Sequence, residues 1–154
     1  LQDTRATLHK LNEMAQNTGM TEEQKVVLSA YCEKTVPWLE DLYYKKFDSN
    51  RLDVLNLYDA ATPIIWNGYR MQGKDGMASA LQQLPTTAHK LETIDCQPII
   101  SENTPAQHLI LATVNGQVTY ADEITNTFNQ VFILKAEGKD LKIVYDCYRW
   151  LSTL

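Results

Sequence analysis

Apolar residues in the first third of the chain recur at three- and four-residue steps, the spacing of a helix that buries one face. The stripe of Leu1, Leu8 and Leu11 predicts a first helix, which Gly19 ends because glycine tolerates the left-handed cap conformation. A second helix is expected over residues 22–47 and a short third one over residues 51–58. Pro37 lacks an amide hydrogen, so we expect it to kink the second helix or to begin a new one.

From Pro63 onward the helical spacing gives way to shorter, strand-like runs. Residues 64–71 predict a hairpin, because Asn67-Gly68 accepts the positive φ angles of a type I′ turn. A short helix is expected over residues 74–84, where Pro85 ends it. Long strands are expected over residues 89–100, 107–120, 127–136 and 141–150, the last two joined by a turn at 137–140.

The last predicted strand is apolar on both sides. Alternation along it assigns one face to Leu141, Ile143, Tyr145, Cys147 and Arg149, and the other to Val144, Tyr148 and Trp150, with Asp146 between them. A strand with one solvent-facing side would instead alternate apolar with polar residues. We therefore predict that helices cover one side of the sheet, and that the other side is either covered by a partner chain or left as an unusually apolar patch.

Composition narrows the class of protein. The chain has 154 residues, which is the size of one domain, and 44% of them are hydrophobic. The net charge of −5 and the lack of a basic run argue against direct binding to nucleic acid or to an anionic membrane. No stretch approaches the roughly 20 apolar residues that a bilayer span needs. The three cysteines show no CxxC spacing, which argues against a disulfide framework or a zinc site and fits a reducing compartment.

Side chains that could carry chemistry are few. The histidines, at positions 9, 89 and 108, lack ligand spacing, and we expect each to be a surface or hydrogen-bonded side chain. Asp95 and Asp146 lie inside apolar strands, where burial raises a carboxyl pKa and can make a general base. The alternative is a carboxylate satisfied by backbone amides, a tyrosine or an arginine. Tyrosines available to stabilise an oxyanion are Tyr43, Tyr44, Tyr58 and Tyr120.

Six short strings, taken in order over residues 21–150, resemble the nuclear transport factor 2-like superfamily. They are Leu42-Tyr43-Tyr44, Trp66-Asn67-Gly68, Leu84-Pro85, Asp95-Cys96-Gln97-Pro98, Phe128-Asn129-Gln130 with Phe132-Ile133-Leu134, and Asp146-Cys147-Tyr148-Arg149. The resemblance implies an α+β fold: a cone-shaped, strongly bent antiparallel sheet packed on three to four N-terminal and intervening helices. It also implies that Gly116 lies within one long strand, at a bulge, although Asn115-Gly116 taken alone predicts a turn.

Within that superfamily the chain looks most like the export-protein branch, the small subunit of the messenger-RNA export receptor. The import branch, which forms a homodimer and carries the GTPase Ran in its GDP form, has a glutamate where Asn67 stands here. It also has two acids in the loop where this chain has Ala121 and Glu123. Fewer acids weaken a charge-matched contact with Ran, so Ran-GDP is not the expected partner. Against this, Gln72-Gly73-Lys74 is similar to the import branch.

The export-type resemblance implies a partner interface on the face of the sheet. Its expected residues are Arg149, Cys147, Tyr145, Leu111 and Thr113, and the expected partner is the matching domain of the large export receptor. Arg149 would be the anchor, since a guanidinium facing a carboxylate in a partly dry interface is worth more than a surface ion pair. Residues 1–20 fall outside the resemblance and are expected to form an N-terminal helical extension, and residues 21–154 are expected to form the domain. The extension is expected either to pack on the domain edge or a neighbouring chain, or to dock a partner.

The function that the resemblance implies is structural. The heterodimer would support binding to phenylalanine-glycine repeats of nuclear pore proteins, would shuttle between nucleus and cytoplasm, and would leave RNA affinity to the large subunit. No cofactor or metal and no catalytic residue is expected. The same fold hosts isomerases and dehydratases, so an enzyme with a cavity lined by Trp66, Tyr148 and Asp146 remains an alternative.

Overall fold

A computed structural model of the chain describes residues 21–99 and 108–151. The helix and cap expected before residue 21, together with His9, lie outside those residues. The described chain begins with one continuous helical run made of α2 (Glu22–Trp38), the π-helical segment η1 (Leu39–Tyr44) and α3 (Lys45–Asn50). The 3₁₀ helix η2 (Arg51–Leu57) follows directly. The helices expected over residues 22–47 and 51–58 are confirmed.

Pro37 lies inside α2 and does not begin a new helix. Proline cannot donate to the carbonyl four residues earlier, which weakens the regular ladder at this point. The helix loosens directly afterwards, and Lys45 N–H donates to the carbonyl of Glu40, five residues back, as in a π-turn. Three side chains of this segment are buried: Leu39, Tyr43 and Tyr44.

The hairpin is confirmed. Strand β1 (Pro63–Trp66) pairs with β2 (Tyr69–Gln72), and the turn residues Asn67 and Gly68 have φ angles of 49° and 89°. Helix α4 (Gly73–Gln83) follows, close to the expected bounds. No helix of the described residues is long and apolar enough to cross a bilayer.

Four long strands complete the fold: β3 (Thr87–Ile99), β4 (Leu109–Tyr120), β5 (Thr125–Glu137) and β6 (Asp140–Trp150). All six strands form one sheet in the order β2-β1-β6-β5-β4-β3. The sheet differs from the expected antiparallel one in a single pairing, since β1 runs parallel to β6. Parallel neighbours need a long connection, and here that connection is everything from β2 to β5.

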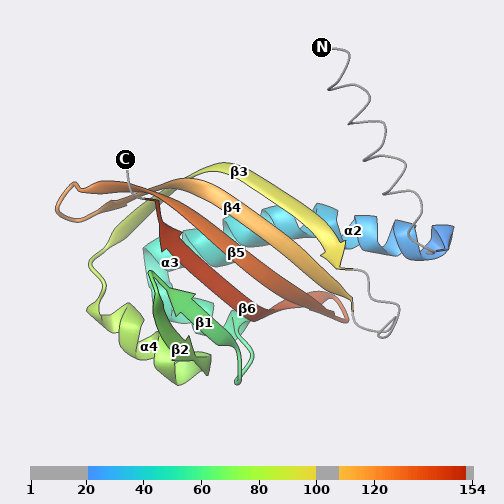
Figure 1. The fold of residues 1–154 in the computed structure, drawn as a ribbon, viewed down its shortest axis with the longest axis horizontal. Helices are drawn as coiled ribbons and strands as arrows, with labels where there is room; N and C mark the ends of the chain where they lie inside the picture. Colours follow the sequence, from blue (N-terminus) through green and yellow to red (C-terminus); the bar gives the residue numbers. More distant parts are fainter. Residues whose placement is uncertain (1–20, 100–107, 152–154) are drawn as a thin grey trace, which may run out of the picture.

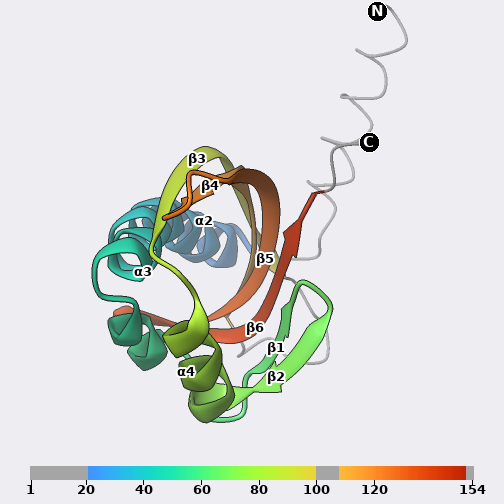
Figure 2. The ribbon, with the colours of Figure 1, turned by 90° about the vertical axis from the view of Figure 1, so that its left-hand side faces the viewer.

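The sheet curls around the helical run, so the α+β cone expected from the resemblance is confirmed (Figures 1 and 2). Helices α2 and α3 lie against the inner side of β3 and β4, and α4 lies beside the hairpin. The core fills the space between helices and sheet. Its largest fully buried side chains include Tyr43, Phe47, Tyr58, Phe128, Phe132 and Tyr148.

Gly116 lies inside β4 and no turn forms there, as the resemblance implied. The bulge, however, belongs to the neighbouring strand, where the register shifts between Leu91 and Thr93. A Cβ atom at Gly116 would lie 2.4 Å from the carbonyl oxygen of Lys90. The glycine therefore lets the bulged strand approach β4 where the sheet bends.

Candidate functional site

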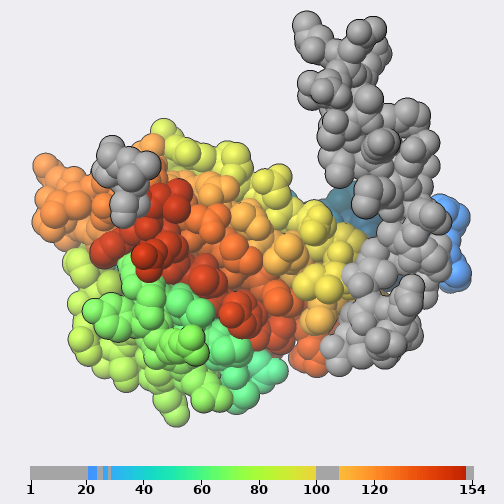
Figure 3. Space-filling view, in the orientation of Figure 1, coloured from blue at the N-terminus to red at the C-terminus, as the bar shows by residue number. Residues whose placement is uncertain are grey.

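The outer face of β4, β5 and β6 has no helix over it in the part of the chain that the structure describes (Figures 1 and 3). The side chains on this face are half-buried or exposed, whereas most of those on the inner face of the same strands are buried. This open face is the candidate site, because it is where the predicted interface residues lie.

Strand pairing brings the predicted residues together. Leu111, Ile133 and Tyr145 are direct neighbours across β4, β5 and β6. Thr113, Val131 and Cys147 form the next row on the same face. These two rows make a continuous, mostly apolar patch, which we call the apolar centre and which Ile65 extends, since Ile65 on β1 pairs with Cys147.

The predicted two-sided pattern of β6 is wrong in part. Leu141 and Ile143 were expected on the face of Tyr145, but both are buried on the inner side. The pairing skips one residue, since Ile133 lies opposite Tyr145 and the next residue of β5 lies opposite Ile143. Val144 is the extra residue of this bulge, and it inverts the alternation on its two sides. Tyr145, Cys147 and Arg149 nevertheless share the outer face, as expected.

Arg149 is exposed at the edge of the apolar centre, in a third row opposite Asn129. Among the residues that the structure describes, no carboxylate pairs with its guanidinium. The hairpin turn lies beside it: a Cβ atom at Gly68 would come within 3.3 Å of Arg149 Nη1. The turn is itself held to β6, because Trp150 N–H donates to Asn67 Oδ1 at 2.7 Å. Arg149 is thus placed by a fixed turn and has its charge free for another molecule.

A ladder of polar side chains continues this third row. Asn129 Nδ2 donates to Asn115 Oδ1 at 2.9 Å, and Asn115 Nδ2 donates to Thr93 Oγ1 at 3.1 Å. The ladder crosses β5, β4 and β3 directly beside the apolar centre. It gives the face a polar border, as in protein interfaces with an apolar core and a hydrogen-bonding rim.

Directly beneath this face lies a closed polar network. Tyr58 Oη donates to one oxygen of Asp146 at 2.6 Å, and Gln130 Nε2 donates to the other at 2.8 Å. Gln130 Nε2 also donates to Tyr43 Oη at 3.0 Å, while Tyr44 Oη donates to Gln130 Oε1 at 2.8 Å. Since Tyr58 gives its proton to Asp146, the 3.0 Å contact between the two hydroxyls has Tyr43 donating to Tyr58.

Burial raises the pKa of the Asp146 carboxyl to about 6, although the hydrogen bonds from Tyr58 and Gln130 favour its charged form. Of the two expected outcomes for this residue, the structure shows the satisfied carboxylate, with Gln130 as a partner that the sequence did not indicate. Asp95, the other candidate base, is exposed on the outer face. Both carboxylates therefore lack the arrangement of a base that faces a substrate.

The remaining residues of the expected cavity are packed against one another. Trp66 stacks on Tyr148 with ring centroids 4.0 Å apart, and Tyr148 stacks on Phe128 at 5.2 Å. Trp66 Nε1 and Tyr148 Oη are buried without a hydrogen-bond partner among the described residues. Tyr120, the fourth tyrosine considered, accepts a hydrogen bond from Trp150 Nε1 at 3.1 Å.

The two histidines within the described residues are engaged locally. His89 Nδ1 lies 2.6 Å from Asp48 Oδ1, and Thr87 Oγ1 donates to the same oxygen at 2.8 Å. Burial opposes ionisation of Asp48, but the bonds from His89 and Thr87 outweigh it and lower the pKa of the carboxyl. His108 packs against Tyr31, with ring centroids 5.5 Å apart. No cluster of three or more metal-ligating side chains occurs among the described residues.

Sequence reasoning missed the β5 half of the open face. Val131 and Ile133 occupy its middle, and Asn129 begins the polar ladder. The signal was present, because these residues alternate with the buried Phe128, Gln130 and Phe132 along one strand. Only the register of β5 against β4 and β6 shows which of the two sets shares a face with Cys147.

The chain is similar in sequence to a known protein family. The family model "Nuclear transport factor 2 (NTF2) domain" matches residues 40–150. The chain is similar to "NTF2-related export protein 1" of Bos taurus, with 31% identity over 114 residues, 71% of this chain and 81% of that protein. It is likewise similar to "Nuclear transport factor 2" of Dictyostelium discoideum, with 31% identity over 111 residues, 70% of this chain and 83% of that protein.

The fold is also similar to a solved structure, nuclear transport factor 2 from Cryptosporidium parvum. The TM-score is 0.60 and the identity is 24%, over 75% of this chain and 96% of that chain. At this identity the likeness concerns the fold alone.

Proposed function

Because the chain belongs to the nuclear transport factor 2 domain family, we propose that it is a non-enzymatic nuclear transport protein of the export type. It pairs through the open face of its sheet with the matching domain of a large export receptor. Relatives named as transport factors, and as export proteins in particular, support this proposal.

The observation that carries the proposal is the apolar centre with Arg149 unpaired at its edge. A large exposed apolar patch on a soluble domain marks an interaction surface. Tyr145, at the β6 end of the first row of the apolar centre, is 36% exposed. An arginine beside such a patch can bind a carboxylate with two parallel hydrogen bonds once a partner excludes water. The face therefore supports a partner with an apolar sheet surface and an acid at one side.

The choice of export over import type rests on two positions. Asn67 supplies a neutral side chain that is already used to hold Trp150 N–H. The loop between β4 and β5 has Ala121 and Glu123 where the import branch has two acids. Both differences lower the negative charge available for a basic partner such as Ran, so the homodimeric Ran-GDP carrier is the less favoured alternative.

The mechanism we propose is stabilisation by mass action. Covering an apolar sheet on the receptor domain favours its folded form, by a free energy that grows with the logarithm of the partner concentration relative to Kd. The assembled pair would then contact phenylalanine-glycine repeats through few apolar contacts, which allow rapid release during passage through the nuclear pore. The small subunit itself needs no basic surface, in keeping with its net charge of −5. Its location would be the nucleus and the cytoplasm, with transit through the pore.

The test is native mass by light scattering, with the chain alone and mixed with the purified receptor domain. We expect a one-to-one complex, and we expect Arg149→Ala to weaken it by about tenfold or more without unfolding the chain. Lys34→Ala is the matched control, because Lys34 is exposed on α2, on the other side of the sheet. A homodimer whose mass does not change when the receptor domain is added would contradict the proposal. So would an Arg149→Ala variant that binds the receptor domain as tightly as Lys34→Ala does.

A further inference from the structure

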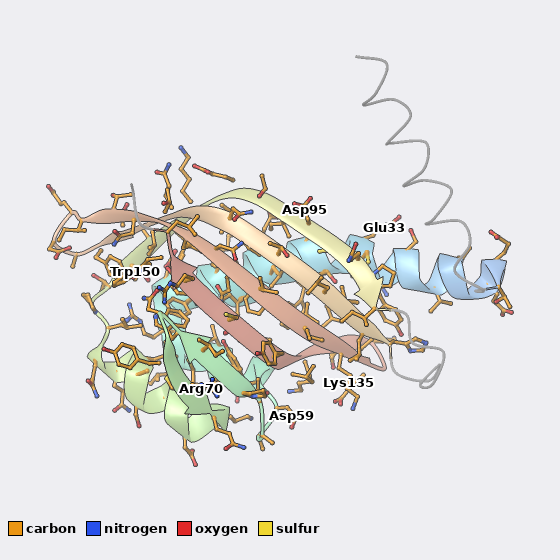
Figure 4. The ribbon with its side chains drawn as sticks, viewed as in Figure 1. Glu33, Asp59, Arg70, Asp95, Lys135 and Trp150 are labelled. Carbon is orange, nitrogen blue, oxygen red and sulfur yellow. The ribbon has the colours of Figure 1, made fainter. Side chains whose placement is uncertain are left out.

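One register row of the outer face ends in charges of opposite sign at the two edges of the sheet. A single register row crosses all six strands, and its members are Asp95, Thr113, Val131, Cys147, Ile65 and Arg70. The row begins with a carboxylate on β3 and ends with a guanidinium on β2. Figure 4 shows Asp95 and Arg70 at these opposite edges. Arg149 adds a second positive charge on the β6 side.

Both terminal charges are available to another molecule. Asp95 and Arg70 are exposed, and within the described residues neither forms an ion pair. Five strand spacings separate them, which is roughly 24 Å along the sheet. That distance exceeds the Debye length of about 8 Å at physiological salt, so each charge acts on what lies directly over it and not on the other.

We propose that this polarity sets the orientation in which the partner's sheet docks, and that the partner carries a base over Asp95 and an acid over Arg70. The inference rests on the proposed function and adds to it the charge pattern that the partner must have. An apolar centre alone does not fix orientation, because apolar contact is non-directional. Two charges of opposite sign at opposite edges do fix the orientation. Rotating the partner so that the two edges of its sheet exchange places would bring like charges together.

A second copy of this chain matches the pattern in one arrangement only. With the two-fold axis along the strands, Asp95 of one copy faces Arg70 of the other. With the axis across the strands, each charge faces its own kind. The receptor domain competes with a second copy of this chain for the same face. An acidic side chain placed to reach both Arg70 and Arg149 would favour the receptor domain over the second copy.

The experiment uses charge reversal at each edge. Asp95→Lys and Arg70→Glu are compared with Glu33→Lys and Lys34→Glu, which make the same charge changes at exposed positions of α2 on the other side of the sheet. Binding to the purified receptor domain is measured by calorimetry at 0.05 M and 0.5 M salt. Thermal unfolding of each variant confirms that it is folded, and the neutral variants Asp95→Asn and Arg70→Gln separate lost attraction from added repulsion.

We expect each edge reversal to raise Kd by about tenfold at low salt, with a smaller effect at high salt, and each neutral variant to raise it by less. The α2 variants should stay within about twofold of the native chain. If both edge variants match the α2 variants while the native chain binds and Arg149→Ala does not, the polarity proposal is overturned and the proposed function stands. If the native chain itself does not bind the receptor domain, the proposed function is what fails.

Discussion

Asp146 and Cys147 are consecutive residues of β6 that lie in opposite environments. Asp146 is fully buried in a network in which every donor has an acceptor, and Cys147 lies half-exposed among apolar neighbours. The network around Asp146 on the inner face thus satisfies its polar groups within the chain, while the outer face leaves apolar groups and charges unmatched. The difference shows which side of the sheet serves folding and which is available for a partner.

Substitutions at two neighbouring residues of β4 test the difference between the inner and outer faces with the largest expected effect. Ile110→Ala removes a fully buried side chain from the inner face of β4, and we expect it to lower the free energy of unfolding by about 2–5 kcal/mol. Leu111→Ala, one residue further on the outer face, should lower it by about 1 kcal/mol or less but weaken receptor binding. Urea unfolding and calorimetric binding measure the two effects. Equal losses of stability would mean that the faces do not differ as described.

The pH dependence of stability tests whether Asp146 on the inner face is held in its buried network. The pKa of Asp146 is about 6 in the folded chain against an ordinary value of 3.8, so folding favours the protonated form. Its favourable contribution is fully present only below the ordinary pKa of 3.8, and it is lost as pH rises from there through the folded pKa of about 6. The difference in unfolding free energy between the native chain and Asp146→Asn should therefore fall by about 2 kcal/mol from pH 4 to pH 7.5.

Urea unfolding of both chains across this pH range is the measurement. Taking the difference removes the titration of other groups, such as Asp48, whose pKa is lowered and whose contribution has the opposite sign. A difference that does not change with pH would show that folding does not raise the pKa of Asp146.

The smallest expected effect concerns the polar ladder. Asn115→Ala removes both side-chain hydrogen bonds of a half-exposed residue on the outer face, so we expect a loss of about 0.5–1 kcal/mol in unfolding free energy. Gln130→Ala, the matched change in the inner network, should be more destabilising because it leaves Tyr44 Oη and one carboxylate oxygen of Asp146 buried without a partner. If the two variants lost equal stability, the ladder would belong to the folding network as well.

Much of the fold could be predicted from sequence because local patterns decide it. Asn67-Gly68 predicted the hairpin through the φ angles that its turn requires, and the long alternating runs predicted β3 to β6. Pro37 shows that a local rule can predict a disturbance without predicting its form. Proline removes one helical hydrogen bond, but the helix continues past it through a π-helical segment. The parallel pairing of β1 with β6 depends on distant segments and leaves no local trace.

The candidate site was predicted less completely. Arg149, Cys147, Tyr145, Leu111 and Thr113 do share one face, but alternation alone placed Leu141 and Ile143 there too. The bulge at Val144 has no sequence signal of the glycine or proline kind, so the change of side could not be seen. The partner of Asp146 was expected to be a tyrosine, an arginine or a backbone amide, and Gln130 emerged only from the register of β5.

Val144 is one extra residue in β6, and it decides which side of the sheet every later residue of the strand faces. Without it, the residues after position 144 would exchange sides, so that Arg149 would point into the core and Asp146 out of the open face. Deleting the half-buried Val144 is therefore expected to disturb the outer face more than substituting it. Relatives that differ in length at this point would present a different surface from an otherwise similar strand.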